Sequence, residues 1–464
     1  MTQSTLRAAT RLTADICIVG HGLPGFVLFT ALRQNPQTKH MKIALLDKDP
    51  LPANGSEDAS RRCVAELRTV SLTQTSTRIL NRLALGSPPS LPLPSSESFV
   101  DSCNSHRFRQ MTVRDMKANV FTIPTTGCIT GLHTLWMSAW RASHALEEAT
   151  DNHQVLCGSI EGLETSTDSG NTVVQVKSSE LGCSTYAIET KLLVGSDGAK
   201  STVRQSVNTR CLSMDYRQRA FVFCVRVEDG SVGCGTHHQA TCYQNFLDDG
   251  SIVAFLPTGK SSGNIVLSAS SALGERITTI IAGQAKSMTE STQTSLLHLL
   301  NSVLHQRAPD DIPRLVGILA DSTPRLNGLQ VASFPLALNV ALRPFSTGSV
   351  LIGDAARTIH PLAGQGLNLG IADSAVLFDC ILEVVQRGGS LSTEVGGLYG
   401  RRMRKHTWPM IASTEIVSGA FSSQNYWINA MRKYGCALVN DSRMLQQVLS
   451  DFASGQYISA SLAQ

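Results

Sequence analysis

The sequence predicts an α/β fold in which an antiparallel β-sheet interrupts a sheet-and-helix domain, and helices end the chain. Three observations predict it. A strand, a glycine-rich turn and a helix follow one another in residues 15–34. Short apolar strands at hairpin-like intervals fill residues 211–270, and a strand again feeds a helix in residues 350–377. Alternating strands and helices are typical of parallel sheets, whereas closely spaced strands are typical of antiparallel ones.

Length and composition bound the class of protein. A chain of 464 residues is too long for one ordinary domain, so two or three cores are expected. Its 42% hydrophobic and 16% charged residues are typical of a globular protein, and a net charge of +4 does not indicate nucleic-acid binding. No apolar run reaches the roughly 18 residues of a membrane-spanning helix. The 12 cysteines include no C-x-x-C pair, so they predict reduced thiols such as Cys17 and no metal site.

The first motif lies where the opening strand feeds a helix. "VGHGLPG" places Gly20, Gly22 and Gly25 in a G-x-G-x-x-G pattern. Gly20 permits the tight turn, Gly22 lets a pyrophosphate approach the backbone, and Gly25 allows close packing of helix and strand. The helix N-terminus offers unpaired N–H groups to the phosphates. Asp47 ends the second strand of this βαβ unit, where its carboxylate can accept ribose hydroxyls, so the pattern predicts dinucleotide binding. Phe29 stands where such helices often carry a small residue.

The middle of the chain contains a second motif, followed by a run of short strands. Residues 132–147 have helical spacing, and "LLVGSDGAKSTVRQ" ends a strand with Asp197 and Gly198. Those two residues are compatible with a nucleotide site or with a simple turn that caps a helix. The strands of residues 211–270 predict an antiparallel sheet. After about Gly389 the chain is mostly helical, with Trp408 and Trp427 expected as core anchors.

The third motif is the segment "VLIGDAARTIHPLAGQGLNLG". If the dinucleotide is FAD, Asp354 at the strand end can accept the ribityl hydroxyls, and Pro361, Gly364 and Gly366 let the chain pass close to the isoalloxazine ring. A helix that starts near Gly366 would direct its positive end toward the ring and stabilise the anionic reduced flavin. A decorated loop between core elements would explain the glycines but not their order. His360 is a candidate acid or base, although it can equally pack or orient the loop.

Together the three motifs resemble the single-component FAD aromatic hydroxylases. The order "GHGLPG", "SDGAKSTVR" and "GDAARTIHPLAGQGLNLG" carries the resemblance over about residues 15–430. The third motif, with "FPLAL" upstream, is similar to the ubiquinone (coenzyme Q) biosynthesis monooxygenases of eukaryotic mitochondria. The resemblance implies a Rossmann-like FAD-binding domain of the glutathione-reductase and p-hydroxybenzoate-hydroxylase type, interrupted by an antiparallel substrate domain. We expect the FAD-binding domain in residues 11–72, 104–206 and 343–388, the substrate domain in 73–103 and 207–342, and a helical region in 389–464.

Site residues follow from the resemblance position by position. It implies FAD contacts for twelve residues, which are Gly20, Gly22, Gly25, Asp47, Arg68, Asp197, Gly198, Asp354, Pro361, Gly364, Gly366 and Asn368. Two features depart from the family. Arg357 stands where His or Gln is usual, and "CITGLHTL" around Thr130 lacks the family's Glu-Asn pair.

The activity implied by the resemblance is hydroxylation of the ring of a polyprenylated ubiquinone precursor with dioxygen, with the C5 position expected. Two rival functions are a hydroxylase of a small soluble aromatic acid and a FAD-stabilised subunit without turnover. The resemblance also implies electrons from a ferredoxin and its reductase, with NADPH as the alternative, and membership of a coenzyme Q complex on the matrix side of the mitochondrial inner membrane. The first residues, with Arg7, Arg11 and no acid before Asp15, have the composition of a mitochondrial presequence or of a frayed polar tail.

Overall fold

The computed structural model describes most of the chain, and every structural statement below concerns the part that it describes. This part comprises residues 10–50, 68–84, 99–103, 105–115, 117, 119–145, 152–178, 185–207, 209–228, 240–282, 290–306, 312–319 and 331–463. The N-terminal segment with Arg7 and the proline- and serine-rich segment 87–98 lie outside the described residues.

A mainly parallel sheet forms the first layer. In the described chain its order is β1–β2–β8–β9–β10–β18–β17, with β10 also beside β1. Strand β1 is parallel to β2 and β10, β2 to β8, and β10 to β18. Ile16, Cys17 and Ile18 of β1 are fully buried, because helices cover such sheets on both faces. The strands are β1 Thr10–Val19, β2 Ile43–Asp47, β8 His153–Thr165, β9 Thr172–Ser178, β10 Thr185–Gly195, β17 Phe345–Ser346 and β18 Ser349–Leu351.

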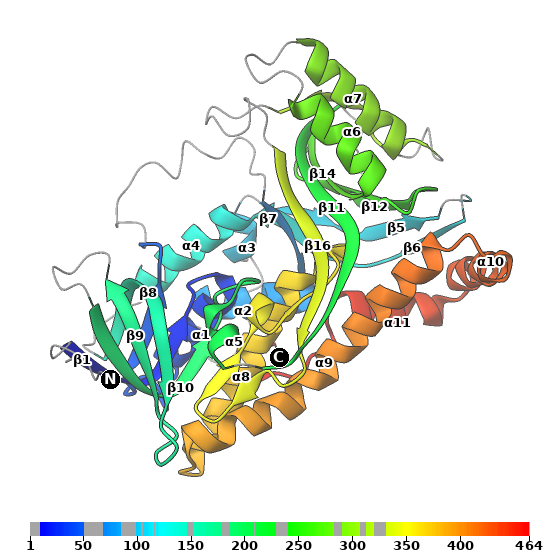
Figure 1. Cartoon of the computed structure of the whole chain (residues 1–464). Helices are drawn as coiled ribbons and strands as arrows, with labels where there is room; N and C mark the ends of the chain where they lie inside the picture. The colour runs from blue at the N-terminus through cyan, green and yellow to red at the C-terminus, as the bar shows by residue number, and fades with distance from the viewer. Residues whose placement is uncertain are drawn as a thin grey trace.

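A second, mainly antiparallel sheet stands beside the first, and its long strands β11 and β16 run from one to the other (Figure 1). Its described order is β19–β16–β11–β14–β13–β12–β5–β6, with β15 on β11. Helices α6 and α7 pack their apolar residues on one face of it. The strands are β5 Gln110–Arg114, β6 Val120–Ile123, β11 Cys211–Val227, β12 Thr241–Phe246, β13 Ile252–Pro257, β14 Ser262–Ser270, β15 Leu315–Ile318, β16 Val331–Ala341 and β19 Arg357–Thr358. A small third sheet contains β3 Thr69–Thr73, β7 Gly127–Gly131 and β4 His106–Phe108.

Helices cover the first sheet and end the chain. The long helix α9 runs along the molecule from the first sheet to α10 and α11 at the far end (Figure 1). The helices are α1 Leu23–Gln34, α2 Gln74–Ala84, α3 Phe99–Ser102, α4 Leu132–Ala145, α5 Thr202–Ser206, α6 Ser271–Ala282, α7 Glu290–Leu304, α8 Gln365–Gln386, α9 Leu391–Ser422, α10 Tyr426–Asp441 and α11 Arg443–Ala453, with 3₁₀ turns η2 Gly353–Ala355, η3 Leu362–Gly364 and η4 Ser461–Ala463. Within the described residues, none of these helices combines the length and apolar character that a membrane crossing needs.

The predicted fold class, an α/β domain interrupted by an antiparallel sheet and followed by helices, is confirmed. Two segments pack differently from the predicted domain boundaries. Helix α2, expected in the substrate domain, packs Ile79 and Leu80 into the core of the first sheet. Strands β5 and β6, expected in the FAD-binding domain, join the antiparallel sheet through β12. The chain therefore leaves the first sheet after α2 and not before it, and it visits the second sheet at β5 and β6. The rest of the domain division stays a prediction.

The prediction of two tryptophan core anchors was wrong. Trp408 is 39% exposed and Trp427 is 73% exposed. Trp427 lies in the first turn of α10. Its one ring contact among the described residues is with its neighbour Tyr426, at a centroid distance of 5.4 Å. A large apolar residue in a helix is therefore not a sufficient signal of burial when the helix lies at the edge of the molecule.

Candidate FAD-binding site

Four of the predicted site residues lie at one edge of the first sheet. Gly20 follows β1, Asp47 ends β2, Asp197 follows β10 and Asp354 follows β18. These four strands are parallel, so their carboxyl ends meet at the same edge. Ligands of doubly wound sheets bind at this edge.

The glycine turn has two tightly packed positions and one open position. Gly20 has a φ of +101°, and a Cβ there would lie 2.4 Å from the carbonyl oxygen of Ser196. A Cβ on Gly25 would lie 2.1 Å from the carbonyl oxygen of Gly20. A Cβ on Gly22 would have nothing within 4 Å. Gly20 and Gly25 therefore fix the turn, and Gly22 leaves its outer side open, as the fingerprint requires.

Asp47 holds the same turn from the side. Its Oδ2 accepts a hydrogen bond from the backbone N–H of His21 at 2.7 Å, and its Oδ1 accepts one from the N–H of Asp49 at 3.0 Å. Trp136 of α4 donates its indole N–H to the carbonyl oxygen of His21 at 2.7 Å. An ionised carboxylate has about four acceptor positions, so Asp47 keeps capacity for a ribose hydroxyl. Trp136 is a contact that the sequence analysis missed.

Asp197 uses its carboxylate as a helix cap. It accepts hydrogen bonds from the Ser201 hydroxyl at 2.5 Å and from the N–H groups of Thr202 at 2.6 Å and Val203 at 3.2 Å. Helix α5 starts there. This geometry supports the alternative interpretation, a turn that caps a helix, for the carboxylate itself. Gly198, with a φ of +80° and open space around its Cβ direction, completes the turn.

Arg204 connects the second motif to the third. Its Nη1 donates to the carbonyl oxygens of Ala355 at 2.9 Å and Asp354 at 3.4 Å, and its Nη2 donates to that of Ala199 at 2.5 Å.

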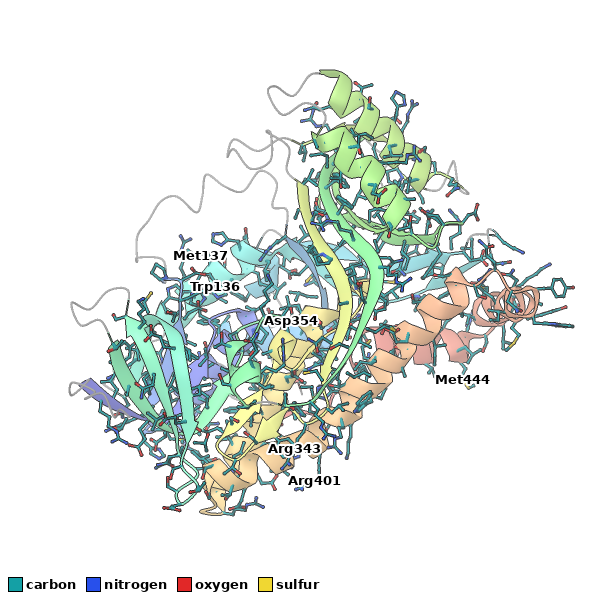
Figure 2. All side chains as sticks on the ribbon, in the orientation of Figure 1. Trp136, Met137, Arg343, Asp354, Arg401 and Met444 are labelled. Atoms are coloured by element: carbon teal, nitrogen blue, oxygen red, sulfur yellow. The ribbon has the colours of Figure 1, made fainter. Side chains whose placement is uncertain are left out.

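The Asp354 side chain reaches solvent near the middle of the molecule (Figure 2). The protein around it removes much of its hydration, which raises the pKa of the carboxyl, while Arg357 acts against this shift.

A buried ionic network lies behind Asp354. Asp373 of α8 accepts Arg357 Nη1 at 2.5 Å and His406 Nε2 of α9 at 2.9 Å. It also accepts the backbone N–H of Gly353 at 2.9 Å. Burial alone would raise the pKa of Asp373, but Arg357 and His406 hold it below its usual value. Arg357, the departure from the family pattern, therefore has a definite function: it neutralises the carboxylate that fixes the turn before Asp354.

The third motif forms the start of α8. Gly364 has a φ of +62° and ends η3, and a Cβ on Gly366 would have nothing within 4 Å. Asn368 is buried and ties this region to β3: its Oδ1 accepts the N–H of Thr73 at 3.0 Å, and its Nδ2 donates to the carbonyl oxygen of Ser71 at 2.8 Å. Pro361 precedes η3. Asn368 thus holds the start of α8 against β3 with both the oxygen and the nitrogen of its side-chain amide.

His360 is buried beside the third motif. Its Nε2 lies 3.0 Å from Oε1 of Gln218 in β11, and its ring meets Tyr216 edge-on at 5.0 Å. Burial lowers its pKa to about 4. Its Nδ1 has no hydrogen-bond partner among the described residues. A buried, neutral imidazole held by an amide favours the packing interpretation over proton transfer.

Arg68 is held at the start of α4, the helix that also carries Trp136. It is exposed just before β3, and its carbonyl oxygen accepts the N–H of Leu132 at 2.7 Å. The structure thus places its backbone at the start of α4. A contact between its guanidinium and FAD stays a prediction.

Sequence reasoning also missed the contact that joins the first and third motifs. A Cβ on Gly370 would lie 2.8 Å from Cγ of Pro24, and the Ser374 hydroxyl donates to the carbonyl oxygen of Pro24 at 2.7 Å. Helices α1 and α8 therefore cross at close range. The sequence carries one signal for this contact: a second glycine, Gly370, four residues after Gly366 in "GLNLG".

An apolar cavity of about 770 Å³ lies next to the start of α8. Leu362 and Gln365 line it from the third motif, and strands β5 and β6 line it from the antiparallel sheet. The C-terminal part of α9, together with α10 and α11, lines its other side. Its volume is in the range of small-molecule pockets, which are lined mainly by apolar side chains.

The described residues fit FAD. Helices α1 and α8 both begin at a glycine, Gly22 and Gly364, and neither N-terminus has a side-chain cap. Helix N-termini of this kind suit phosphate or an electron-rich ring edge. Gly22 and Gly366 leave space where a Cβ would project. Two helix starts at glycines and carboxylates at one sheet edge are the features of an FAD-binding protein with a doubly wound sheet.

Comparison with known proteins agrees with this class. Residues 129–393, more than half of the chain, match the family described as FAD binding domain. The chain belongs to this family, and the prediction of FAD as the cofactor is confirmed.

Individual relatives point to one branch. The chain is 28% identical over 282 residues to the mitochondrial ubiquinone biosynthesis monooxygenase COQ6 of Caenorhabditis elegans, covering 58% of this chain and 60% of that protein. It is 22% identical over 470 residues to the Dictyostelium discoideum protein of the same name, covering 96% and 92%. The crystal structure of p-nitrophenol 4-monooxygenase from Pseudomonas putida superposes with a TM-score of 0.65 at 14% identity, covering 97% and 99%. The predicted resemblance to the ubiquinone branch is confirmed, although the match spans only about 60% of the first relative.

Proposed function

We propose that this protein is an FAD-dependent monooxygenase that hydroxylates the aromatic ring of a polyprenylated ubiquinone precursor, at ring position C5. The observation that carries the proposal is the apolar cavity beside the start of α8. Gln365, the neighbour of Gly366 where we expect the flavin ring, lines it, and its apolar lining suits a hydrocarbon tail. The relatives named as ubiquinone biosynthesis monooxygenases support the same substrate class.

The chemistry needs little from the side chains beyond binding and positioning. Reduced FAD supplies the activation of dioxygen, which gives one oxygen atom to an electron-rich phenol. The partial positive charge at the N-terminus of α8 would stabilise negative charge beside it. Asn368 fixes the first turns of α8 against strand β3. Neutral His360, buried against Tyr216, excludes water from the side of the antiparallel sheet.

The location and partners belong to the same proposal. The protein acts in mitochondria at the matrix side of the inner membrane, as a member of a multi-subunit coenzyme Q complex, and receives electrons from ferredoxin. The mitochondrial names of the relatives support the compartment. A membrane-bound substrate requires an enzyme that reaches the bilayer, which supports a peripheral position.

Loss of the protein in its host tests the proposal directly. Mass spectrometry of the accumulating quinone precursor should reveal a polyprenylated phenol that lacks the C5 hydroxyl. A precursor blocked at another ring position would refute the C5 assignment, and an unchanged quinone pool would refute the pathway. With purified protein, substrate-dependent oxygen consumption separates an enzyme from a non-catalytic subunit. Dependence on tail length separates it from a hydroxylase of small aromatic acids, which should be indifferent to the tail.

A further inference from the structure

The outer side of the C-terminal hairpin exposes a row of large apolar residues. They lie on α10 and α11 and are 58% to 75% exposed, and we call them the outer face: Tyr426, Trp427, Met431, Tyr434, Leu438, Met444 and Val448. Four of the α10 members follow one another at intervals of four, three and four residues, which places them on one stripe of the helix. Met444 marks the α11 part at the edge of the molecule (Figure 2).

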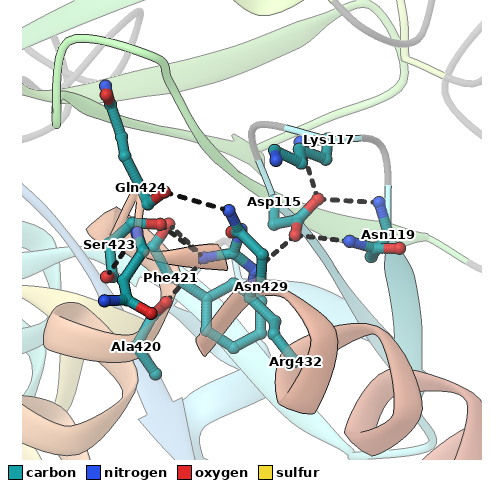
Figure 3. A network of polar contacts seen from close by, with 10 residues as sticks. Asp115, Lys117, Asn119, Ala420, Phe421, Ser423, Gln424, Asn429 and Arg432 are labelled. Carbon is teal, nitrogen blue, oxygen red and sulfur yellow. Dashed lines mark hydrogen bonds and ion pairs between the residues drawn. The ribbon is translucent and has the colours of Figure 1, made fainter. Parts of the chain in front are cut away.

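A buried ionic network holds this face rigidly outward (Figure 3). Arg432, on the opposite side of α10, donates Nε to Asp115 Oδ2 at 2.5 Å, and both side chains are at most 1% exposed. Its Nη1 donates to the carbonyl oxygens of Ala420 at 2.6 Å and Phe421 at 3.1 Å at the end of α9. Breaking a buried ion pair is costly, so α10 cannot easily rotate its apolar stripe inward.

The other end of α10 is also fixed. Asn440 donates Nδ2 to the carbonyl oxygen of Val120 at 2.7 Å and accepts the N–H of Thr122 at 3.3 Å. Both contacts are on β6, the edge strand of the antiparallel sheet. Helix α10 is therefore anchored at both ends, and the exposure of its outer face is a fixed feature of the fold.

We propose that the outer face is a lipid-binding surface that inserts into the interfacial layer of a bilayer. Its tyrosines and tryptophan are the residues that favour the membrane–water interface, and methionine and leucine supply the apolar area. Exposed Lys433 and Arg443 lie on the same hairpin and suit anionic headgroups, with Asp441 as the exposed acid between them. Apolar patches of this kind mark interaction sites.

The cavity explains why lipid, and not a protein partner, fits this surface best. Met431 belongs to the outer face and also lines the cavity, together with the partly exposed Ile428 and the exposed Ile416. The cavity therefore opens beside the outer face and leads to Leu362 at the third motif. A protein on this surface would close the opening, whereas a bilayer would supply an apolar substrate through it. This last step rests on the proposed function, and the lipid contact itself does not.

Vesicle binding without substrate tests the surface. The probe is a phosphatidylcholine vesicle that contains a minority of phosphatidylglycerol, and the bound fraction of the FAD-loaded full chain is measured by flotation. We expect the wild-type protein to bind and the triple variant Trp427→Ser, Tyr434→Ser and Leu438→Ser to lose at least about tenfold in partitioning. The matched control, Val155→Ser, Val316→Ser and Leu342→Ser, removes exposed apolar residues elsewhere and should bind like the wild type.

Further readings distinguish the outcomes. The FAD content of the triple variant and its turnover of detergent-solubilised substrate should match the wild type, because Trp427, Tyr434 and Leu438 line neither the cavity nor the three motifs. Equal vesicle binding by wild type and triple variant would overturn the proposal, as would a wild type that does not bind vesicles. A wild-type dimer that the triple variant dissolves would identify the face as an interface between copies instead. Absent turnover in all variants, with vesicle binding intact in the wild type, would refute the proposed function and leave the lipid surface standing.

Discussion

The carboxylate of Asp373 receives the guanidinium of Arg357 at 2.5 Å, with side-chain exposures of 0% and 2%. The pair joins α8 to the segment just after Asp354. Because Asp373 also accepts the N–H of Gly353, the same carboxylate sets the turn that presents Asp354. Stability and the proposed cofactor site are therefore coupled at this point.

Replacing Asp373 with Asn should leave the buried cation of Arg357 without its counter-charge. We expect the free energy of unfolding to fall by about 3–5 kcal/mol, measured from urea denaturation. Arg357→Gln should also destabilise the protein, but the double variant should lose less than the sum of the single losses, with a coupling of about 1–3 kcal/mol. Additive losses would show that the two side chains do not stabilise each other.

Gly22→Val should abolish the retention of FAD. The backbone at Gly22, with φ −53° and ψ 161°, accepts any residue, so the variant should fold. Its side chain would fill the open space at the start of α1, where we expect the pyrophosphate. The flavin absorbance per protein after gel filtration measures the effect. Gly317→Val, a strand glycine with ordinary space in the antiparallel sheet, serves as the control. Stoichiometric FAD in Gly22→Val would refute our assignment of the glycine turn.

Gly366→Val should damage oxygen transfer more than FAD affinity. Gly366 lies in the first turn of α8, away from the glycine turn of α1, and an added side chain would project into open space. We expect near-normal flavin content with a product yield lowered by about tenfold or more and the missing oxygen recovered as hydrogen peroxide. Normal hydroxylation combined with reduced flavin content would mean that the loop binds another part of the cofactor.

His360 should make the fold sensitive to acid. Its pKa in the folded protein is lowered from 6.5 to about 4 by burial. The unfolded chain takes up this proton below pH 6.5, but the folded chain does so only near pH 4, so stability is lost as the pH falls through this window. The slope from one such group is at most about 1.4 kcal/mol per pH unit. Urea midpoints between pH 7.5 and 5.5 should therefore fall less steeply for His360→Asn, and an unchanged slope would contradict the buried, neutral state.

The sequence allowed the strand ends to be predicted because their signals are local. Gly20, Asp47, Asp197 and Asp354 each follow an apolar strand, and parallel strands necessarily bring their ends together. The role of Asp197 could not be decided in the same way. The same Asp-Gly-x-x-Ser letters describe a helix cap and a nucleotide contact, and only the hydrogen bonds to Ser201, Thr202 and Val203 distinguish the two.

Contacts between residues that are distant along the chain could not be predicted from the sequence, for a physical reason. Arg432 and Asp115 meet across 317 residues, and no local pattern marks either of them as buried. Trp427 shows the opposite error, because hydrophobicity alone predicts burial, while the anchoring of α10 by Arg432 turns that side of the helix to solvent. Partners that are distant along the chain decide both outcomes.

The last prediction concerns the electron donor. The sequence has one G-x-G-x-x-G fingerprint, Gly20–Gly25 with Asp47 after it, and this site is assigned to FAD. We therefore expect NADPH alone to reduce the flavin slowly and a ferredoxin system to reduce it quickly. Exposed Arg401, Arg404 and Lys405 give α9 a basic side that suits an acidic ferredoxin.

Anaerobic stopped-flow reduction with each donor, in the presence of substrate, measures both rates. Reduction by ferredoxin should slow as salt is added, because screening weakens contacts between exposed charges. Reversing the three α9 charges to Glu should slow it by about tenfold, while reduction by dithionite stays unchanged. The control reverses three exposed charges of the antiparallel-sheet domain, Arg226, Lys260 and Arg276, and should behave like the wild type. Fast bleaching by NADPH alone would eliminate the ferredoxin hypothesis, and equal rates for the two triple variants would remove α9 as the docking side.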